Sequence, residues 1–291
     1  MKALITGFGF IGKQLAKNLK QNGYEVAILG RTPPEEKSYR FINCDIRDKK
    51  KIIESARGHD FIFHLAGVLG TDYLTEGGLE RIEESISINI NGSLHIFEAA
   101  RKNNSTVINA GLVPNWANPY MITKKAAAKF GEMYFNEFGT DIRTLELSHV
   151  YGPGQKDKPV KKVIPCFILS ALQNKPLTIF GKGTNKMDCI YVDDAAEAFR
   201  LAAENKKMKG AVASVGTGRE ITVLELAKKV IKLANSSSKL IFKEMRAGEP
   251  DKHDDYSSLN LSNWKKFNKW LPSTTLEQGL ENTIEWYRKN L

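Results

Sequence analysis

The residues with the clearest chemical potential are Tyr120 and Lys124, which lie four positions apart in "GLVPNWANPYMITKK" (Gly111 to Lys125). A free tyrosine has a pKa of about 10, too high for a base at neutral pH, and a nearby ammonium group would lower that pKa by favouring the phenolate. The pair could then move a proton to or from a hydroxyl or carbonyl group of a substrate. This spacing also arises by chance, so two ordinary residues on a helix face are the alternative.

A helix is expected to carry this pair. Asn118 can cap a helix whose first position is Pro119, and the helix should end before Gly139. Residues at i and i+4 share one helix face. The side chains of Tyr120 and Lys124 should therefore point the same way.

Three glycines near the start of the chain form a second candidate site. Gly7, Gly9 and Gly12 give the pattern G-x-G-x-x-G between "KALIT", a predicted buried strand, and a helix predicted over Lys13 to Asn22. Glycines let the backbone turn tightly and approach a pyrophosphate, while the helix N-terminus offers unpaired N–H groups to the phosphates. This context predicts dinucleotide binding, and a glycine turn that serves packing is the alternative.

The end of the second predicted strand, "EVAIL", bears on which dinucleotide binds. An acidic residue there would accept the ribose 2′-OH, whereas an arginine can bind a 2′-phosphate. The chain has Gly30 and Arg31 at this place, which favours NADP over NAD. An exposed loop arginine is the alternative. Asp45, after the third strand, could reach the adenine or cap the next segment.

Strands and helices alternate through the first half of the chain, with strands expected in "KALIT", "EVAIL", "YRFINCD", "DFIFHLA" and "TVINAG". Alternation requires parallel pairing with crossovers, which predicts an α/β fold with a doubly wound parallel Rossmann sheet. Residues 1–150 are expected to form this dinucleotide-binding domain. Residues 188–205, a predicted strand and helix, are expected to return to it.

The rest of the chain, residues 151–291, is expected to form most of a smaller C-terminal α/β lobe that binds the substrate. Prolines and glycines separate short elements there, as in "KKVIPCFILSALQNKPLTIFGKGTNK". Two capping boxes predict helix starts, Thr222 with Glu225 and Thr274 with Glu277. Asp193 is predicted to cap the returning helix.

Length and composition fit a globular protein, since 291 residues with 42% hydrophobic content can bury a full core. No apolar run approaches the ~20 residues that cross a bilayer. The N-terminus "MKALITGFGFIG" is broken by glycine and lacks a cleavage site, so a cytoplasmic protein with no membrane partner is expected. Three widely spaced cysteines support neither a disulfide framework nor a zinc site, and no metal is predicted.

The net charge of +10 makes an anionic partner reasonable. No basic array with interleaved aromatic residues is present, which argues against nucleic acid. A phosphate-bearing small molecule explains the charge, and a solvated basic surface explains it nearly as well.

Eight stretches, spread from end to end of the chain, form a recognisable combination: "TGFGFIG", "DFIFHLAG", "NINGSLHIFEAARKN", "NPYMITKKAA", "HVYGPGQ", "PLTIFGKGT", "IYVDDAAEAF" and "TTLEQGLENTIEWYRKNL". Together they resemble the extended short-chain dehydrogenase/reductase family, specifically its nucleotide-sugar epimerases, dehydratases and reductases.

The resemblance implies that Tyr120 is the acid/base and that Lys124 binds the nicotinamide ribose. It implies a nucleoside-diphosphate sugar between the lobes, with Arg246 as the main diphosphate clamp by bidentate pairing. The cofactor contacts that it implies are Gly7, Gly9, Phe10, Ile11, Gly12, Arg31, Asp45, Ile46, Leu65, Ala66, Gly67, Asn89, Tyr120, Lys124 and Val150. The implied substrate contacts are Asn109, Gly111, His149, Val163, Thr178, Phe180 and Arg246.

Several residues depart from the family's pattern. Where the family usually carries a Ser or Thr that hydrogen-bonds the reacting oxygen, this chain has Gly111. Asn109, Asn115 or a water could replace that hydroxyl, or activity is reduced or lost. The dehydratase pattern Thr-Asp-Glu is absent there, which argues against 4,6-dehydration. Met187 replaces an arginine that contacts phosphate in the family. His149 replaces the usual asparagine, and a structural role is the simpler interpretation of this histidine than a catalytic one.

Three functions are compatible with these features. The preferred hypothesis is an NADPH-dependent reductase acting at C4 of a 4-keto nucleotide sugar, because Arg31 favours NADP. An NAD-dependent nucleotide-sugar 4-epimerase is the alternative. The third is a non-catalytic NADP(H)-binding sensor or scaffold, which Gly111 and Met187 would fit. In this family the helices in "SLHIFEAARKN" and after Tyr120 often pair across a two-fold axis, so a homodimer is expected.

Overall fold

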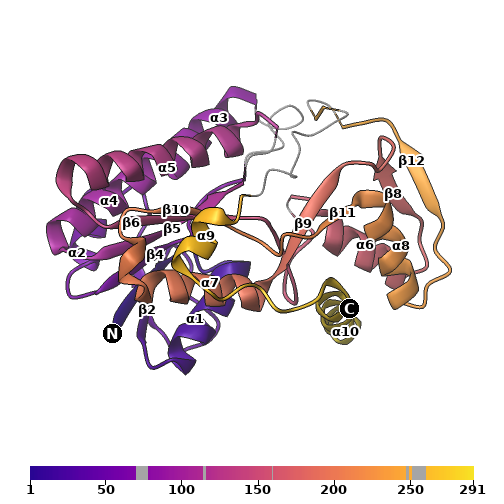
Figure 1. Cartoon of the computed structure of the whole chain (residues 1–291), viewed down its shortest axis with the longest axis horizontal. Helices are drawn as coiled ribbons and strands as arrows, with labels where there is room; N and C mark the ends of the chain where they lie inside the picture. Colours follow the sequence, from indigo (N-terminus) through magenta and orange to yellow (C-terminus); the bar gives the residue numbers. More distant parts are fainter. Residues whose placement is uncertain (70–77, 114–115, 159, 247–248, 251–259) are drawn as a thin grey trace.

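A seven-stranded parallel sheet forms the centre of the structure, a computed structural model that describes all residues except 70–77, 114–115, 159, 247–248 and 251–259 (Figure 1). All neighbouring strands in it pair in parallel. The order is β10-β6-β5-β4-β1-β2-β3. Their bounds are β1 (Lys2–Thr6), β2 (Glu25–Gly30), β3 (Arg40–Asn43), β4 (Phe61–His64), β5 (Thr106–Leu112), β6 (Ile142–Leu147) and β10 (Val212–Val215). The predicted doubly wound α/β fold is confirmed.

Helices cover both faces of this sheet (Figure 1). One face carries α2 (Lys49–Ser55), α4 (Gly92–Asn103) and α5 (Pro119–Phe138), with α3 (Gly78–Ser85) and the π-helical η1 (Ile86–Asn91) leading into α4. The other face carries α1 (Phe10–Gln21), α7 (Val192–Glu204) and α9 (Ser262–Phe267), with the 3₁₀ turn η2 (Lys206–Met208) after α7. Within the described residues, no helix is both long and apolar enough to cross a membrane.

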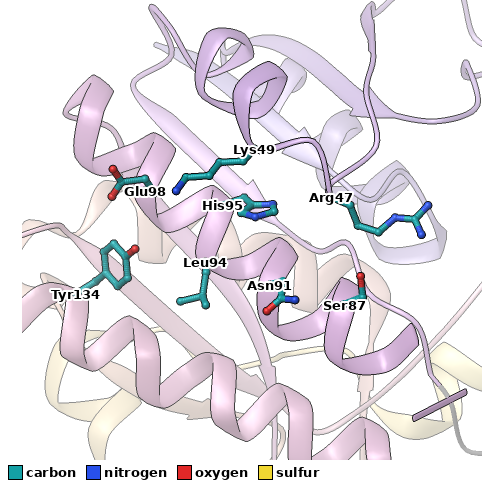
Figure 2. A pocket seen from close by; sticks show the side chains of 8 residues that line it. All are labelled: Arg47, Lys49, Ser87, Asn91, Leu94, His95, Glu98 and Tyr134. Atoms are coloured by element: carbon teal, nitrogen blue, oxygen red, sulfur yellow. The ribbon is translucent and has the colours of Figure 1, made fainter. Parts of the chain in front are cut away.

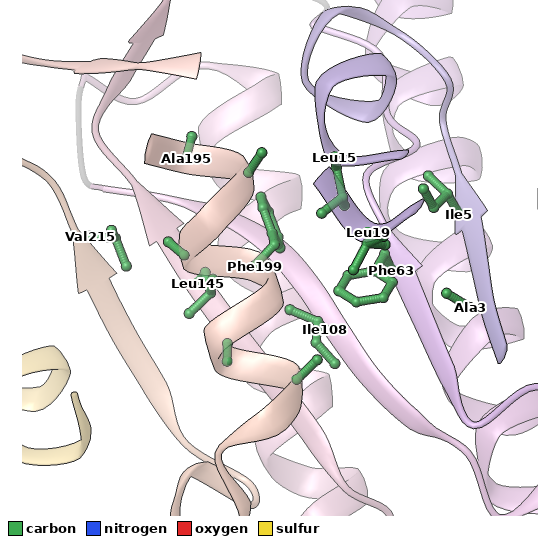
Figure 3. Packing of buried hydrophobic residues seen from close by; sticks show 14 of the residues in the cluster. Ala3, Ile5, Leu15, Leu19, Phe63, Ile108, Leu145, Ala195, Phe199 and Val215 are labelled. Atoms are coloured by element: carbon green, nitrogen blue, oxygen red, sulfur yellow. The ribbon is translucent and has the colours of Figure 1, made fainter. Parts of the chain in front are cut away.

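Side-chain alternation along the buried strands supplies a core on each face. In β1, Ala3 and Ile5 join the core under α1 and α7, whereas Leu4 joins the core under α2 and α4. Figure 3 shows the first of these cores, with Phe199 of α7 directed at the strands and Phe63 beside Leu19 of α1. Each strand is therefore buried on both sides, as a parallel sheet requires.

A smaller C-terminal lobe has its own mixed sheets and core. Its three-stranded sheet consists of β7 (His149–Tyr151), β9 (Lys186–Tyr191) and β11 (Glu220–Thr222), and its two-stranded sheet consists of β8 (Leu177–Phe180) and β12 (Leu240–Lys243). The helices α6 (Val163–Leu172), α8 (Val223–Leu233) and α10 (Leu276–Asn290) pack there. The position of the domain boundary near residue 150 stays a prediction.

The predicted helix start before the Tyr/Lys pair is confirmed. Asn118 Oδ1 accepts a hydrogen bond from the Met121 N–H at 2.9 Å, and Pro119 follows it. Gly139 ends α5 with a φ of +66°. The capping box of Thr222 and Glu225 at α8 is also confirmed.

Two other predicted caps are wrong. α10 is capped by Thr275, which accepts from the Gln278 N–H at 3.2 Å, and not by Thr274. The Thr274 N–H is bonded at 3.0 Å to Asp194 in α7, which holds Thr274 outside the helix. Asp193 lies inside the first turn of α7, because strand β9 runs directly into the helix and Tyr191 is the cap.

The first helix is also longer than predicted. α1 begins at Phe10 and not at Lys13, and it ends at Gln21. The first turn of the helix therefore includes Phe10, Ile11 and Gly12, which the sequence pattern assigned to the glycine turn, and Gly9 is the residue that precedes the helix.

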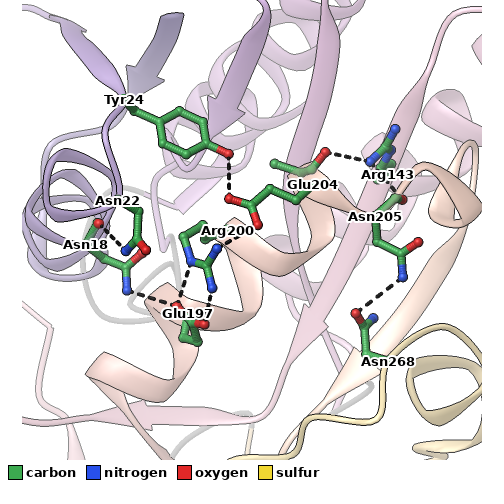
Figure 4. A network of polar contacts seen from close by, with 10 residues as sticks. Asn18, Asn22, Tyr24, Arg143, Glu197, Arg200, Glu204, Asn205 and Asn268 are labelled. Atoms are coloured by element: carbon green, nitrogen blue, oxygen red, sulfur yellow. Dashed lines mark hydrogen bonds and ion pairs between the residues drawn. The ribbon is translucent and has the colours of Figure 1, made fainter. Parts of the chain in front are cut away.

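Arg143 fastens the far end of α7 to the sheet (Figure 4). It is almost fully buried in β6, and its Nη1 donates to the carbonyl oxygens of Ala202, Ala203 and Asn205 at 2.6, 2.9 and 3.1 Å. Its Nη2 pairs with Asp141 at 2.6 Å. A buried cation here satisfies helix-terminal carbonyls that have no helical partner.

Replacing Arg143 by methionine should lower the free energy of unfolding by about 3–5 kcal/mol, since it leaves the buried carbonyls without their donor and the Asp141 carboxylate without its cation. Urea unfolding measures this. The matched control is Lys129→Met, which removes an exposed pair with Glu132 and should cost less than about 1 kcal/mol. Equal losses in the two variants would contradict the assignment.

Candidate active site

The glycine loop is shaped by close backbone contacts. A Cβ on Gly7, whose φ is +86°, would lie 2.5 Å from the Ala66 nitrogen, and one on Gly12 would lie 2.3 Å from the Gly7 carbonyl oxygen. Gly9 is exposed, caps α1 without any side chain, and leaves the first N–H groups of the helix without a side-chain acceptor. This arrangement fits a pyrophosphate, which backbone donors at a helix N-terminus bind well.

Three other predicted cofactor residues, Leu65, Ala66 and Gly67, directly follow the C-terminal end of β4. The Leu65 N–H donates to the Thr6 carbonyl at 2.9 Å, which carries the sheet pairing one residue past β4. Asn89 bonds both the N–H and the carbonyl of Val68 at 2.9 Å, and so fixes the segment that contains Ala66 and Gly67. The remaining ones are Phe10 and Ile11 in the first turn of α1, Ile46 buried against Gly92, and Val150 in β7.

Arg31 and Asp45 lie near each other beyond the ends of β2 and β3. Asp45 is bound by Arg47, with Nε–Oδ1 at 2.9 Å and Nη2–Oδ2 at 2.6 Å. These hydrogen bonds lower the pKa of Asp45 to about 2, and the charge of Arg31 contributes. Asp45 does not cap α2, because Asp48 does so. Contacts of Arg31 and Asp45 with a cofactor stay predictions.

A row of buried polar side chains crosses four adjacent strands below the site. Cross-strand register aligns Thr6 of β1, His64 of β4, Asn109 of β5 and Thr144 of β6. Thr6 Oγ1 lies 2.8 Å from His64 Nδ1, and Asn109 Nδ2 donates to Thr144 Oγ1 at 3.2 Å. The sequence shows these residues near strand ends, but only the register shows that they form one row.

The row fixes the protonation of His64. Ser93 Oγ donates its single hydrogen to the Asn89 carbonyl at 2.6 Å, so its contact with His64 Nε2 at 2.9 Å must use a proton on the histidine. Nδ1 is the acceptor for Thr6 when the ring is neutral. Burial, assisted by the charge of Lys124, lowers the pKa of His64 well below its usual value, so the ring is neutral.

The same network reaches the helix that carries the Tyr/Lys pair. Asn89 Nδ2 donates to Thr123 Oγ1 at 3.0 Å, and Thr123 Oγ1 donates to the Pro119 carbonyl at 2.7 Å. Thr123 directly precedes Lys124. Buried hydrogen bonds therefore join α5 to the end of β1, which directly precedes the glycine loop.

Tyr120 and Lys124 both face inward from α5. Lys124 is 3% exposed, and burial lowers the pKa of its ammonium group to about 8. Among the described residues, it has no hydrogen-bond or ion-pair partner. Burial raises the pKa of Tyr120, which is the opposite of the predicted lowering by Lys124. Helix spacing alone does not produce a phenolate, because desolvation is the dominant effect on this hydroxyl.

The space beside Gly111 is already filled. A Cβ at this position would lie 2.9 Å from Thr144 Cγ2, 3.3 Å from the Leu145 carbonyl oxygen and 3.4 Å from Glu146 Cγ. Of the predicted substitutes for the missing hydroxyl, Asn109 is fully buried below this point. Asn115 lies outside the described residues.

The predicted substrate residues of the C-terminal lobe gather near β8. Arg246 lies over the ring of Phe180, 5.2 Å from its centroid, and pairs with Glu249 at 2.5 Å. Thr178 lies two residues before Phe180 in β8, and Val163 begins α6. Glu249 was not predicted, although an acid three residues after the arginine was a signal for it. His149 is half-buried in β7 and pairs in register with Cys189.

A cavity of about 540 Å³ lies elsewhere, between α2, η1, α4 and α5 (Figure 2). Its lining consists of Arg47, Lys49, Ser87, Asn91, Leu94, His95, Glu98 and Tyr134. None of these is a predicted site residue.

The parallel sheet, the glycine loop at α1 and the Tyr-x-x-x-Lys helix define an enzyme that uses a nicotinamide dinucleotide. The family model described as the NAD dependent epimerase/dehydratase family matches residues 3–216. The chain belongs to this family of nucleotide-sugar enzymes.

Individual relatives match along the whole chain. A UDP-N-acetyl-alpha-D-glucosaminuronate decarboxylase of Bacillus cytotoxicus is 30% identical, over 99% of this chain and 98% of its own. The UDP-glucose 4-epimerase of Thermotoga maritima, solved with UDP-glucose, has a TM-score of 0.88 at 27% identity, over 100% of this chain and 99% of its own. The UDP-glucuronic acid 4-epimerase of Bacillus cereus, solved with UDP-glucuronic acid and NAD, has 0.84 at 25%, over 100% of both chains.

The buried ammonium of Lys124 should make stability depend on pH. The pKa of Lys124 is about 8 in the folded protein and has its ordinary value of 10.5 in the unfolded chain. Between these two pH values the unfolded chain binds more protons than the folded protein, so the free energy of unfolding rises with pH there. Lys124→Met should therefore raise the free energy of unfolding at pH 7, by about 3 kcal/mol. The gain should vanish above pH 10.5.

Urea unfolding at several pH values measures this, with Lys129→Met on the exposed side of the same helix as the control. A loss of stability at pH 7 in Lys124→Met, or a gain independent of pH, would show that the ammonium is well solvated or well paired.

Proposed function

We propose that this enzyme oxidises C4 of a nucleoside-diphosphate sugar and reduces it again with a retained cofactor, as nucleotide-sugar 4-epimerases do. The observation that carries the proposal is the Tyr120/Lys124 pair on α5, with Tyr120 half-buried and Lys124 buried, in a helix that Thr123 joins by a hydrogen bond to Asn89. The two 4-epimerases above share this fold over their whole length, and one was solved with NAD.

In this mechanism Tyr120 moves the proton and the C-terminal lobe holds the substrate. As phenolate, Tyr120 accepts the proton of O4 while the C4–O bond becomes a carbonyl, and it returns the proton when C4 is reduced. A bound nicotinamide would take the C4 hydrogen with its electron pair and later give it back. Lys124 would bind the nicotinamide ribose, and its charge would offset the cost of the buried phenolate. Arg246 would bind the diphosphate.

One observation favours a second candidate, an NADPH-dependent 4-keto-sugar reductase. β2 ends at Gly30, which has no carboxylate to accept from the ribose 2′-OH, and the exposed Arg31 follows it directly. Such a site suits a 2′-phosphate. A cofactor that leaves after each turnover suits a reductase, whereas an epimerase recycles it in place.

A homodimer is proposed through α4 and α5. Met133 and Phe138 of α5 are exposed, whereas Phe130 and Tyr134 of the same helix pack against the chain's own core. Part of this helix therefore has an apolar surface that its own sheet does not cover.

Tyr120→Phe should lower kcat on UDP-sugars by about 10²- to 10⁴-fold while binding of NADH or NADPH is unchanged, because only the proton-transferring hydroxyl is lost. Steady-state kinetics and fluorescence titration measure the two properties. Tyr134→Phe in the same helix is the matched control. Full activity in Tyr120→Phe would exclude the mechanism. If the unchanged protein does not turn over UDP-sugars, the result would point to the sensor or scaffold.

Mass spectrometry of the small molecules released on denaturing the fresh protein distinguishes the two candidates. An epimerase should release NAD(H) in about equal amount to the protein. Release of NADP(H) would instead support the reductase. So would an affinity at least tenfold higher for NADPH than for NADH, if Arg31→Ala abolishes that preference.

A further inference from the structure

We infer that Glu146, together with Lys125, hydrogen-bonds the reacting oxygen of the sugar and takes the place of the hydroxyl that Gly111 lacks. The inference rests on the proposed function and assigns a substrate contact to residues outside the family's expected pattern. It follows from where β6 and α5 place these two side chains.

Glu146 is the direct cross-strand neighbour of Gly111. The register of β5 and β6 pairs the two residues, each one position before the C-terminal end of its strand. Glu146 Cγ would lie 3.4 Å from a Cβ at position 111, so the glutamate occupies space beside the one that a serine side chain would use. Ligands of such sheets bind at this carboxyl edge.

Two bonds hold the Glu146 carboxylate in place. Lys125 Nζ lies 2.5 Å from Oε1, and Ser214 Oγ donates to Oε2 at 3.1 Å. Lys125 directly follows Lys124 in α5, and Ser214 lies in β10 on the other side of β6. The position of the carboxylate is therefore fixed from both sides.

The pair is not sealed in the protein. The Glu146 side chain is 15% exposed and that of Lys125 is 33% exposed. A hydroxyl group both donates and accepts a hydrogen bond, whereas an ammonium only donates and a carboxylate only accepts. Glu146 can thus accept the single hydrogen of the sugar hydroxyl when the substrate first binds, before that hydrogen turns to the Tyr120 phenolate, and Lys125 can donate to the carbonyl oxygen after oxidation. The two residues together offer what one serine would offer.

The other possible role is purely structural, with the pair joining α5 to β6. A structural pair would affect folding and cofactor binding, whereas a substrate contact affects turnover at unchanged cofactor affinity. Glu146→Gln keeps the shape and removes the charge. It should lower kcat by about ten- to hundredfold, with the affinity for NADH and the unfolding midpoint close to those of the unchanged protein.

A rescue variant gives the sharper test. Thr144→Ser removes the Cγ2 methyl that would lie 2.9 Å from a Cβ at position 111, and keeps the Oγ that Asn109 binds. Adding Gly111→Ser to the double variant Thr144→Ser/Glu146→Gln should raise kcat at least tenfold above that of the double variant, because it returns a hydroxyl to this place. Thr144→Ser with Glu146→Gln is the matched control and should show no recovery.

The experiment uses the whole chain of residues 1–291 with UDP-glucose and UDP-glucuronic acid as probes, and records turnover and the absorbance of reduced cofactor. Failure of the unchanged protein on both probes would remove the proposed function, and this inference with it. Turnover that survives in Glu146→Gln, or a loss that the added serine does not reverse, would overturn the inference and leave the proposed function standing.

Discussion

The interaction on which the site depends is the hydrogen-bond chain that runs from Thr6 through His64 and Ser93 to Asn89. It begins one residue before the glycine loop and ends in the π-helical turn between α3 and α4. Since Ser93 gives its single hydrogen to the Asn89 carbonyl, Nε2 of His64 must carry a proton. Burial keeps the ring neutral, so Nδ1 has no proton and accepts the hydrogen of Thr6 Oγ1. The chain thus aligns β1, β4 and α4 in a single arrangement.

That arrangement also sets the electrostatics around Lys124. The histidine beside it is neutral, and no carboxylate among the described residues pairs with it, so the ammonium remains buried without compensation. Buried charges of this kind destabilise a fold, and proteins retain them where a ligand uses them. A ribose and a developing phenolate would supply the partners that the protein itself withholds. Burial has two effects on Tyr120. It raises the pKa of the hydroxyl, and it also strengthens every charge interaction around that hydroxyl.

Local signals in the sequence predicted the elements that carry the site. Alternating strands and helices gave the parallel sheet, and Asn118 with Pro119 placed the start of α5 correctly, because these signals act over a few residues. The failures concern interactions across elements. Thr274 fits a capping box as well as Thr275 does, and the bond from its N–H to Asp194 decides between them. The polar row and the contact of Gly111 with Glu146 depend on register, which no stretch of sequence contains.

Gly111 illustrates why a missing side chain has to be judged with its neighbours. On the sequence alone it is a loss, since a hydroxyl that touches the reacting oxygen is gone. In the structure, Thr144 and Glu146 crowd the place, so a serine would not fit beside the present β6 without a change at position 144. Neighbouring parallel strands end at the same edge, and either can present a group to a ligand bound there. Activity in such a fold depends on which groups the edge presents, and not on which strand supplies them.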